Sequence, residues 1–77
     1  MAIVVKFFAS LRESLDLAEA QVDPSQAKTV ADVWQVATDH AAMPPNTLIA
    51  INMEYVDKSQ DVTDGDEVAF FPPVSGG

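Results

Sequence analysis

The chain has 77 residues, of which 48 % are hydrophobic and 21 % are charged, a composition typical of one small globular domain. Twelve acids against four lysines and arginines give a formal net charge of −8, which makes nucleic acid and anionic membranes unexpected partners and favours a basic protein surface. There is no cysteine, so disulfides, thiolate metal sites and a cysteine nucleophile are excluded.

The first quarter of the chain predicts a strand, a short helix and a second strand. Residues 3–8 alternate with period two and are apolar on both faces, which indicates a central strand. Residues 9–17 carry leucines four apart and predict a short helix, and residues 17–23 return to alternation before Asp23-Pro24. Lys6 and the lack of a basic leader argue against a signal peptide, and no segment approaches the ~20 apolar residues of a membrane span. We therefore expect a cytoplasmic protein.

The clearest element is an amphipathic helix that begins after Thr29. Thr29 is a favoured N-cap residue, and Asp32 lies in the first turn, where the helix dipole stabilises negative charge. The helix is expected to end before Pro44-Pro45. Its apolar face repeats at i, i+3, i+4 and i+7 through Val30, Val33, Trp34 and Ala37.

The second half predicts three short strands. Two of them, at residues 47–52 and 55–58, flank a tight turn at residues 53–54, and an Asp64-Gly65 turn precedes a final strand that ends at Phe71. The fold class is therefore α+β, with a mixed sheet of about five strands and one main helix packed on one face. The apolar first and last strands are expected side by side in the centre, which is the β-grasp, or ubiquitin-like, topology.

Side-chain chemistry is sparse. His40 is the only histidine and falls near the expected end of the main helix, where an exposed residue that compensates the helix dipole is more expected than a catalytic base. No serine has a histidine and an acid near it in the sequence, so no catalytic triad is indicated. The acids between residues 57 and 67 do not have the spacing of a calcium loop, and a hairpin turn with solvated charges explains them better. No metal site is expected.

The last six residues, PPVSGG, form a distinct segment. Pro72 and Pro73 fix φ near −65°, donate no backbone hydrogen bond and hold Phe71 extended, so the sheet must stop there. Six residues reach at most roughly 20 Å, far enough to enter the active site of another protein. We therefore divide the chain into a domain over residues 1–71 and a protruding, flexible tail over residues 72–77.

The terminal glycines have a physical use. Without a Cβ atom, Gly76 and Gly77 can pass through a narrow channel and leave the terminal carboxylate open to a reagent. Two terminal glycines also arise by chance in roughly one chain in two hundred. A diglycine that follows a Pro-Pro exit from a β-grasp strand is stronger evidence for a functional tail than the diglycine alone.

These stretches give the chain a family resemblance. It resembles the small, sulfur-carrier subunit of molybdopterin synthase, the MoaD family, in VKFFASLRE, TVADVW, IAINMEYV and above all DGDEVAFFPPVSGG. Carriers of the thiamine pathway share the fold and the diglycine but usually lack the FFPPVSGG approach. Compared with the family, the present chain is short between the main helix and TLIAIN.

The resemblance implies that Gly77 carries the sulfur. A partner similar to ubiquitin-activating enzymes, an adenylyltransferase, would adenylate the Gly77 carboxylate with ATP, and a sulfur donor protein would displace AMP to leave a thiocarboxylate. The loaded tail would then enter the large subunit and supply sulfur to cyclic pyranopterin monophosphate, building the molybdopterin dithiolene. The isolated chain would be no enzyme and would bind no cofactor tightly. Together with the large subunit it would form a heterotetramer of two small and two large subunits.

The same resemblance implies a set of partner-binding residues. Gly76, Ser75, Val74 and Pro73 belong to the tail that enters the partner's channel. Phe71 and Tyr55 are candidates for an apolar docking patch on the sheet face away from the helix, because alternation turns Val68 and Phe70 inward and Ala69 and Phe71 outward. Phe71 buried at a twisted edge is the alternative. Arg12, within the matching LRE stretch, could pair with an acid of this chain or of the partner.

Three other functions remain open from the sequence. The chain could carry sulfur for another pathway, such as thiamine. It could be a ubiquitin-like protein modifier whose Gly77 forms isopeptide bonds with lysines. It could also be a binding module whose acidic surface or sheet edge acts without the tail.

Overall fold

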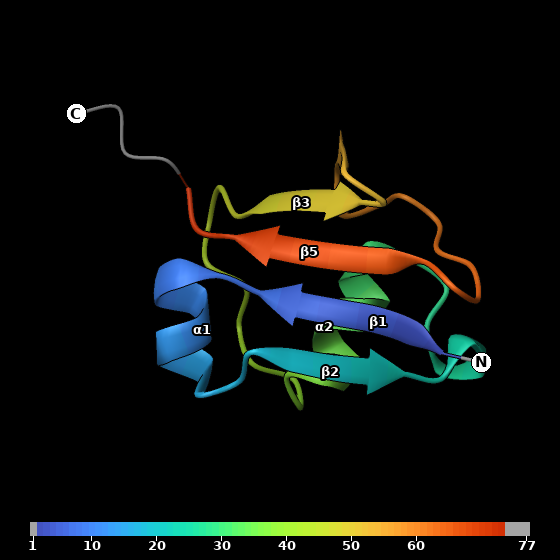
Figure 1. Cartoon of the computed structure of the whole chain (residues 1–77), viewed down its shortest axis with the longest axis horizontal. Coiled ribbons are helices and arrows are strands. Elements are labelled where there is room, and N and C mark those ends of the chain that lie inside the picture. Colours follow the sequence, from blue (N-terminus) through green and yellow to red (C-terminus); the bar gives the residue numbers. More distant parts are fainter. Residues whose placement is uncertain (1, 74–77) are drawn as a thin grey trace.

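The structure is a computed structural model, and it describes residues 2–73. One five-stranded sheet has the order β2-β1-β5-β3-β4, with β1 and β5 parallel and the other neighbours antiparallel. The helix α2 covers one face of the sheet, and α1 lies at the end where β1 and β5 finish (Figure 1). The α+β β-grasp prediction is confirmed. The elements are β1 (Ile3–Phe7), α1 (Ala9–Leu15), β2 (Glu19–Val22), a short 3-10 turn (Pro24–Gln26), α2 (Val30–Ala37), β3 (Leu48–Ile51), β4 (Glu54–Val56) and β5 (Glu67–Phe71).

The two most apolar strands, β1 and β5, occupy the middle of the sheet as the sequence predicted. Their register pairs Val5 with Val68 and Phe7 with Phe70, and all four side chains are buried on the α2 side. Each of them removes apolar surface from water, at ~25 cal/mol per Å². The core is completed by Ile3, Leu11, Val22, Ala27, Val30, Val33, Trp34, Ile49 and Val62.

The main helix begins where the sequence predicted but ends earlier. Thr29 Oγ1 accepts from the Asp32 amide, and the Asp32 carboxylate accepts from the Thr29 amide, which completes a capping box. The expected extension to Pro44 is wrong, because α2 stops at Ala37. The His40 amide donates to the Gln35 carbonyl at 2.8 Å, a bond that closes the helix as in a Schellman motif.

The β3–β4 hairpin is one residue out of the expected register. Its two-residue turn is Asn52-Met53 rather than residues 53–54, because Ile51 pairs with Glu54 across the strands. Both turn residues have positive φ, 49° and 73°, the pattern of a type I′ turn. Consequently β4 covers Glu54–Val56 and not residues 55–58.

The acidic segment between β4 and β5 contains the predicted turn at Asp64-Gly65, but the hairpin predicted for it is wrong, because β5 pairs with β1 and β3 and not with β4. The Asp57 carboxylate bonds the amide and hydroxyl of Ser59, and the Asp66 carboxylate accepts from the Thr63 amide at 2.8 Å. Gly65, with φ of 92°, supplies the left-handed residue next to Asp66. Within residues 2–73, no group of three or more His, Asp or Glu side chains is arranged to hold a metal ion. No helix in this same range is long and apolar enough to cross a membrane.

Candidate functional site

The sheet face opposite α2 carries an apolar groove, called here the outer groove. One row of register partners crosses it, from Tyr55 on β4 through Ala50 on β3 and Ala69 on β5 to Lys6 on β1. Two alanines in the middle of this row keep the floor low, while larger side chains stand around it. The groove has a volume of about 330 Å³, and Phe8, Phe71, Met53 and Glu67 complete its lining.

The end of the outer groove nearest the tail is built by two stacked phenylalanines. The rings of Phe8 and Phe71 lie 4.7 Å apart with an angle of 8° between their planes. Phe71 is half-buried by this contact, while Phe8 stays 39 % exposed. Phe71 faces outward, as predicted, and the two rings present one apolar surface directly before Pro72 and Pro73.

A single ion pair lies within the outer groove. Lys6 Nζ is 3.0 Å from Glu67 Oε1, and both side chains are about two-fifths exposed. The hydrogen bond with Glu67 and the charge of that carboxylate raise the pKa of Lys6. Water screens an exposed pair of this kind, so its effect on stability is small. The pair also determines the charge of the groove, because the two opposite charges compensate each other and leave no net charge there.

The remaining predicted site residues are not brought to this groove. Arg12 lies in the last turn of α1 and lines a separate hollow with Glu13 and Asp16. Among residues 2–73 the one ion pair is Lys6–Glu67, so Arg12 pairs with no acid in the described part of the chain. The predicted tail residues Val74, Ser75, Gly76 and Gly77 lie outside the described residues.

His40 has the place that the sequence predicted. It is exposed just beyond α2, and its Nδ1 atom lies 3.0 Å from Gln35 Oε1. This contact belongs to the helix end and not to the outer groove.

The sequence analysis did not place Phe8 and Met53 in the groove, nor Lys6, Ala50 and Glu67. Phe8 follows Lys6 by two positions, so the alternation of the first strand was a sufficient signal that both point outward. Met53 could not be placed by alternation, because a hairpin turn interrupts the strand. The available signal was Asn52, a residue that tolerates positive φ and so marks the start of the turn.

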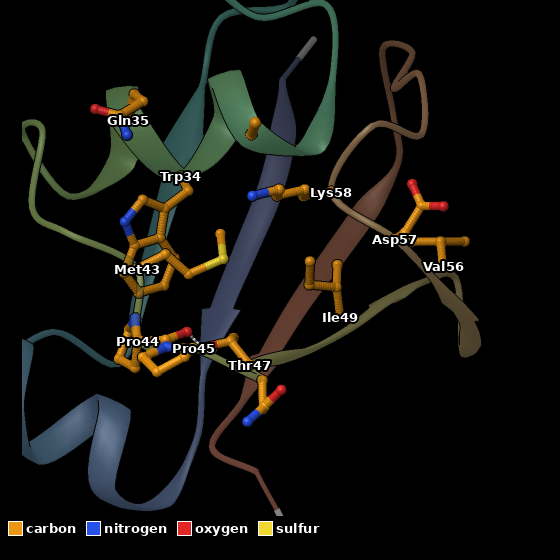
Figure 2. A pocket seen from close by; sticks show the side chains of 12 residues that line it. Trp34, Gln35, Met43, Pro44, Pro45, Thr47, Ile49, Val56, Asp57 and Lys58 are labelled. Carbon is orange, nitrogen blue, oxygen red and sulfur yellow. Dashed lines mark hydrogen bonds between the residues drawn. The ribbon is translucent and has the colours of Figure 1, made fainter.

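A second hollow lies on the other side of the sheet, between α2, the loop before β3 and the end of β4 (Figure 2). Its volume is about 470 Å³. At its base Trp34 Nε1 donates to the Ala41 carbonyl at 2.7 Å, and at its rim Thr47 Oγ1 donates to the Pro44 carbonyl at 2.7 Å. Both bonds hold the loops around the hollow.

Comparison with known sequences gives the family. The family model described as the ThiS family matches residues 5–77. The molybdopterin synthase sulfur carrier subunit of Escherichia coli is 37 % identical over 84 aligned positions, which cover 97 % of this chain and 99 % of that protein.

Solved structures agree on the fold. SAMP1, a small archaeal modifier protein from Haloferax volcanii, aligns over the whole of both chains with a TM-score of 0.77 and 28 % identity. A chain from the complex of subunits 1 and 2 of the molybdopterin-converting factor of Helicobacter pylori aligns over the whole of both chains with a TM-score of 0.67. The 21 % identity of that second chain supports the fold alone. The chain therefore belongs to the MoaD/ThiS family of ubiquitin-like sulfur carriers, in which the molybdopterin synthase sulfur carrier subunits are its relatives.

Proposed function

We propose that this chain is the sulfur-carrier subunit of a molybdopterin synthase and that Gly77 carries the sulfur. The observation behind the proposal is the family match, which runs through Gly77, together with the near full-length likeness to a molybdopterin synthase sulfur carrier subunit. The chain itself supplies the acceptor carboxylate and the docking surface. The catalytic groups belong to its partners, so the isolated chain is no enzyme and binds no cofactor tightly.

The proposed chemistry takes place at one carbonyl carbon. The Gly77 carboxylate attacks the α-phosphorus of ATP on the adenylyltransferase, pyrophosphate leaves, and a mixed anhydride with AMP forms. A hydrosulfide-level nucleophile from the sulfur donor protein then attacks the carbonyl carbon and expels AMP, which leaves a thiocarboxylate. Gly76 and Gly77 have no Cβ atom to hinder either attack. Two thiocarboxylates, one for each sulfur atom, then convert cyclic pyranopterin monophosphate into the molybdopterin dithiolene, and water releases each Gly77 again as a carboxylate.

The outer groove supports the proposed partnership with the large subunit. It begins at Phe71, immediately before Pro72, so a protein that takes the tail into its active site must also cover this end of the sheet. An exposed apolar patch of this kind is typical of a protein interface. In this proposal Phe71 and Tyr55 dock, and residues 73–76 cross the partner's channel. Arg12, on α1, would contact an acid at the rim of that interface.

The assembly is expected to be a heterotetramer, with one tail at each end of a large-subunit dimer. A structural neighbour from Helicobacter pylori is named as a complex of subunits 1 and 2 of the molybdopterin-converting factor, which supports a two-subunit assembly. The location expected for these steps is the cytoplasm, with no part for nucleic acid or membrane.

The proposal predicts a specific mass change. After co-expression with the adenylyltransferase and a sulfur source, intact mass spectrometry should show one oxygen replaced by sulfur, and fragmentation should place the change at Gly77. Deleting Gly77 should abolish both this change and molybdopterin formation from cyclic pyranopterin monophosphate by the reconstituted synthase.

The matched control is Ser14→Ala, an exposed substitution on α1 that should leave mass change and product formation at the wild-type level. Circular dichroism should give the Gly77 deletion a wild-type melting temperature. Product formation by the deletion variant would contradict the proposal.

A protein modifier is the second candidate, because SAMP1 is a structural neighbour. That function requires isopeptide bonds between Gly77 and lysines of other proteins. Tryptic digestion of cell extracts would then leave the peptide from Ser59 to Gly77 attached to lysines of other proteins, because Lys58 is the last basic residue, and these branched peptides would disappear with the Gly77 deletion. A thiamine-pathway carrier would instead co-purify with a thiazole synthase.

A further inference from the structure

Met53 stands in a conformation that its side chain does not favour. With Asn52 it forms the two-residue β3–β4 turn, and its φ of 73° lies in the left-handed region. Type I′ turns strongly prefer glycine at this second position, because residues with a Cβ atom are hindered there. The chain thus places a large apolar side chain where glycine would fold more easily.

Folding gains nothing from this side chain. Met53 is 93 % exposed, so its thioether arm contributes almost no buried apolar surface. An apolar side chain that is both strained and exposed is expected at functional positions, where the backbone holds it for a partner.

The turn beneath Met53 is fixed to the sheet by its neighbour. The Asn52 amide donates to the Glu67 carbonyl at 2.9 Å, and Asn52 Oδ1 accepts from the Glu67 amide at 3.0 Å. Asn52 Nδ2 also donates to Asp66 Oδ1 at 3.0 Å. These three bonds hold the turn against the start of β5. The backbone that carries Met53 is therefore already fixed before a partner binds, which lowers the entropic cost of binding.

Met53 lies at the end of the outer groove opposite the tail. In the β3–β5 register, Leu48 is beside Phe71, while Ile51, just before the turn, is beside Val68. The groove thus runs from Phe71, where the tail leaves the sheet, to the turn at Met53. Tyr55, which is 75 % exposed, also lines the groove. The Lys6–Glu67 pair between these ends is internally compensated, which favours an uncharged partner surface.

We propose that Met53 is a distal anchor for the large subunit, inserted into a pocket lined by aliphatic or aromatic side chains. This inference rests on the proposed function, since the partner is the protein that receives the tail. A methionine suits such a pocket because its unbranched thioether adapts to shape and contacts aromatic rings favourably. Met53 thus sets affinity for the partner and takes no part in the chemistry at Gly77.

The test is the substitution Met53→Gly, which removes the anchor and relieves the strain. Binding to the large subunit, measured by isothermal titration calorimetry, should weaken roughly 5- to 30-fold, the range of an interface hot spot. The melting temperature should stay at or above that of the wild type. In the synthase assay the KM for the thiocarboxylated carrier should rise, while kcat should be unchanged because the tail is intact.

Two further variants separate the anchor from the strain. Asp39→Gly relieves a positive φ of 56° at an exposed position after α2, and it should not change binding. Met53→Leu keeps an apolar side chain and should stay within a few-fold of the wild-type affinity.

The outcomes distinguish the two proposals. If wild type binds and transfers sulfur but Met53→Gly binds equally well, the anchor inference is overturned and the proposed function stands. If the wild-type thiocarboxylate forms but binds no large subunit, the proposed function fails, and the anchor inference fails with it.

Discussion

The side chain of Trp34 joins three parts of the fold. It is 1 % exposed, and its ring meets Phe7 at 5.8 Å and Phe70 at 4.9 Å in edge-to-face geometry. Its Nε1 atom donates to the Ala41 carbonyl in the loop after α2. One residue therefore links the helix, the two central strands and the loop, by both burial and a hydrogen bond.

Trp34→Phe tests this role. The smaller ring leaves a cavity against Phe70 and removes the donor to the Ala41 carbonyl, so the free energy of unfolding should fall by about 1–3 kcal/mol. Urea denaturation followed by circular dichroism measures it. Val36→Ala, on the exposed side of the same helix, should change it by less than about 0.5 kcal/mol, and an equal loss in both variants would contradict the argument.

At the scale of elements, α2 has a strong start and a locally closed end. The Asp32 carboxylate accepts from the amides of Lys28 and Thr29, and these bonds hold its pKa below the ordinary value. The amide and hydroxyl of Ser25 lower the pKa of Asp23, and the hydroxyl and amide of Ser59 lower the pKa of Asp57. These three carboxylates therefore stabilise the fold while they are ionised, Asp23 and Asp32 at helix starts and Asp57 in a turn.

These three carboxylates predict acid sensitivity. Because the folded-state pKa of Asp32 is lowered, its stabilisation is complete above the unfolded-state pKa of about 3.9 and is lost as pH falls through the folded-state pKa. Thermal melts at decreasing pH should show this loss. Asp32→Asn keeps an acceptor without titrating, so its stability should fall less steeply below about pH 4. A slope identical to that of the wild type would contradict the role of Asp32.

The elements also show how far sequence patterns reach. Thr29 and Asp32 specify the start of α2, because capping is a contact between residues three apart in the chain. The end of α2 was misplaced by several residues because Pro44 marks only the last possible position. The helix stops earlier because Asp39 and His40 adopt positive φ and Trp34 bonds Ala41, and neither event has a sequence signature of its own.

At the scale of the whole molecule, the two sheet faces have different roles. One face of the sheet is covered by α2 (Figure 1), and the core lies beneath that helix. The opposite face carries the outer groove. Around this arrangement the chain carries a net charge of −8, and residues 2–73 contain a single ion pair. Most acids are therefore not matched by a contacting cation, and they repel one another across a small domain.

Added salt should stabilise the fold. Raising sodium chloride from about 0.01 M to 0.15 M shortens the screening length from about 30 Å to 8 Å, which weakens repulsion between exposed acids. The melting temperature at neutral pH should rise. In a double variant Asp61→Asn and Asp64→Asn, both exposed positions, the rise should be smaller. A melting temperature that falls with salt in the wild type would contradict this account.

The sequence by itself determined the strand alternation, the capped helix, the central pairing of β1 with β5 and the outward face of Phe71. The alternation, the capping and the outward face of Phe71 follow from periodicity and contacts between neighbours in the chain, and the central place of β1 and β5 follows from their strongly apolar composition. Only the tertiary structure decided that Phe8 stacks on Phe71, that Lys6 compensates Glu67, and that Met53 stands at the far end of the same groove. Each of these depends on strand order and turn register. They bring together residues as far apart in the chain as Phe8 and Phe71 and leave no mark in any short stretch of sequence.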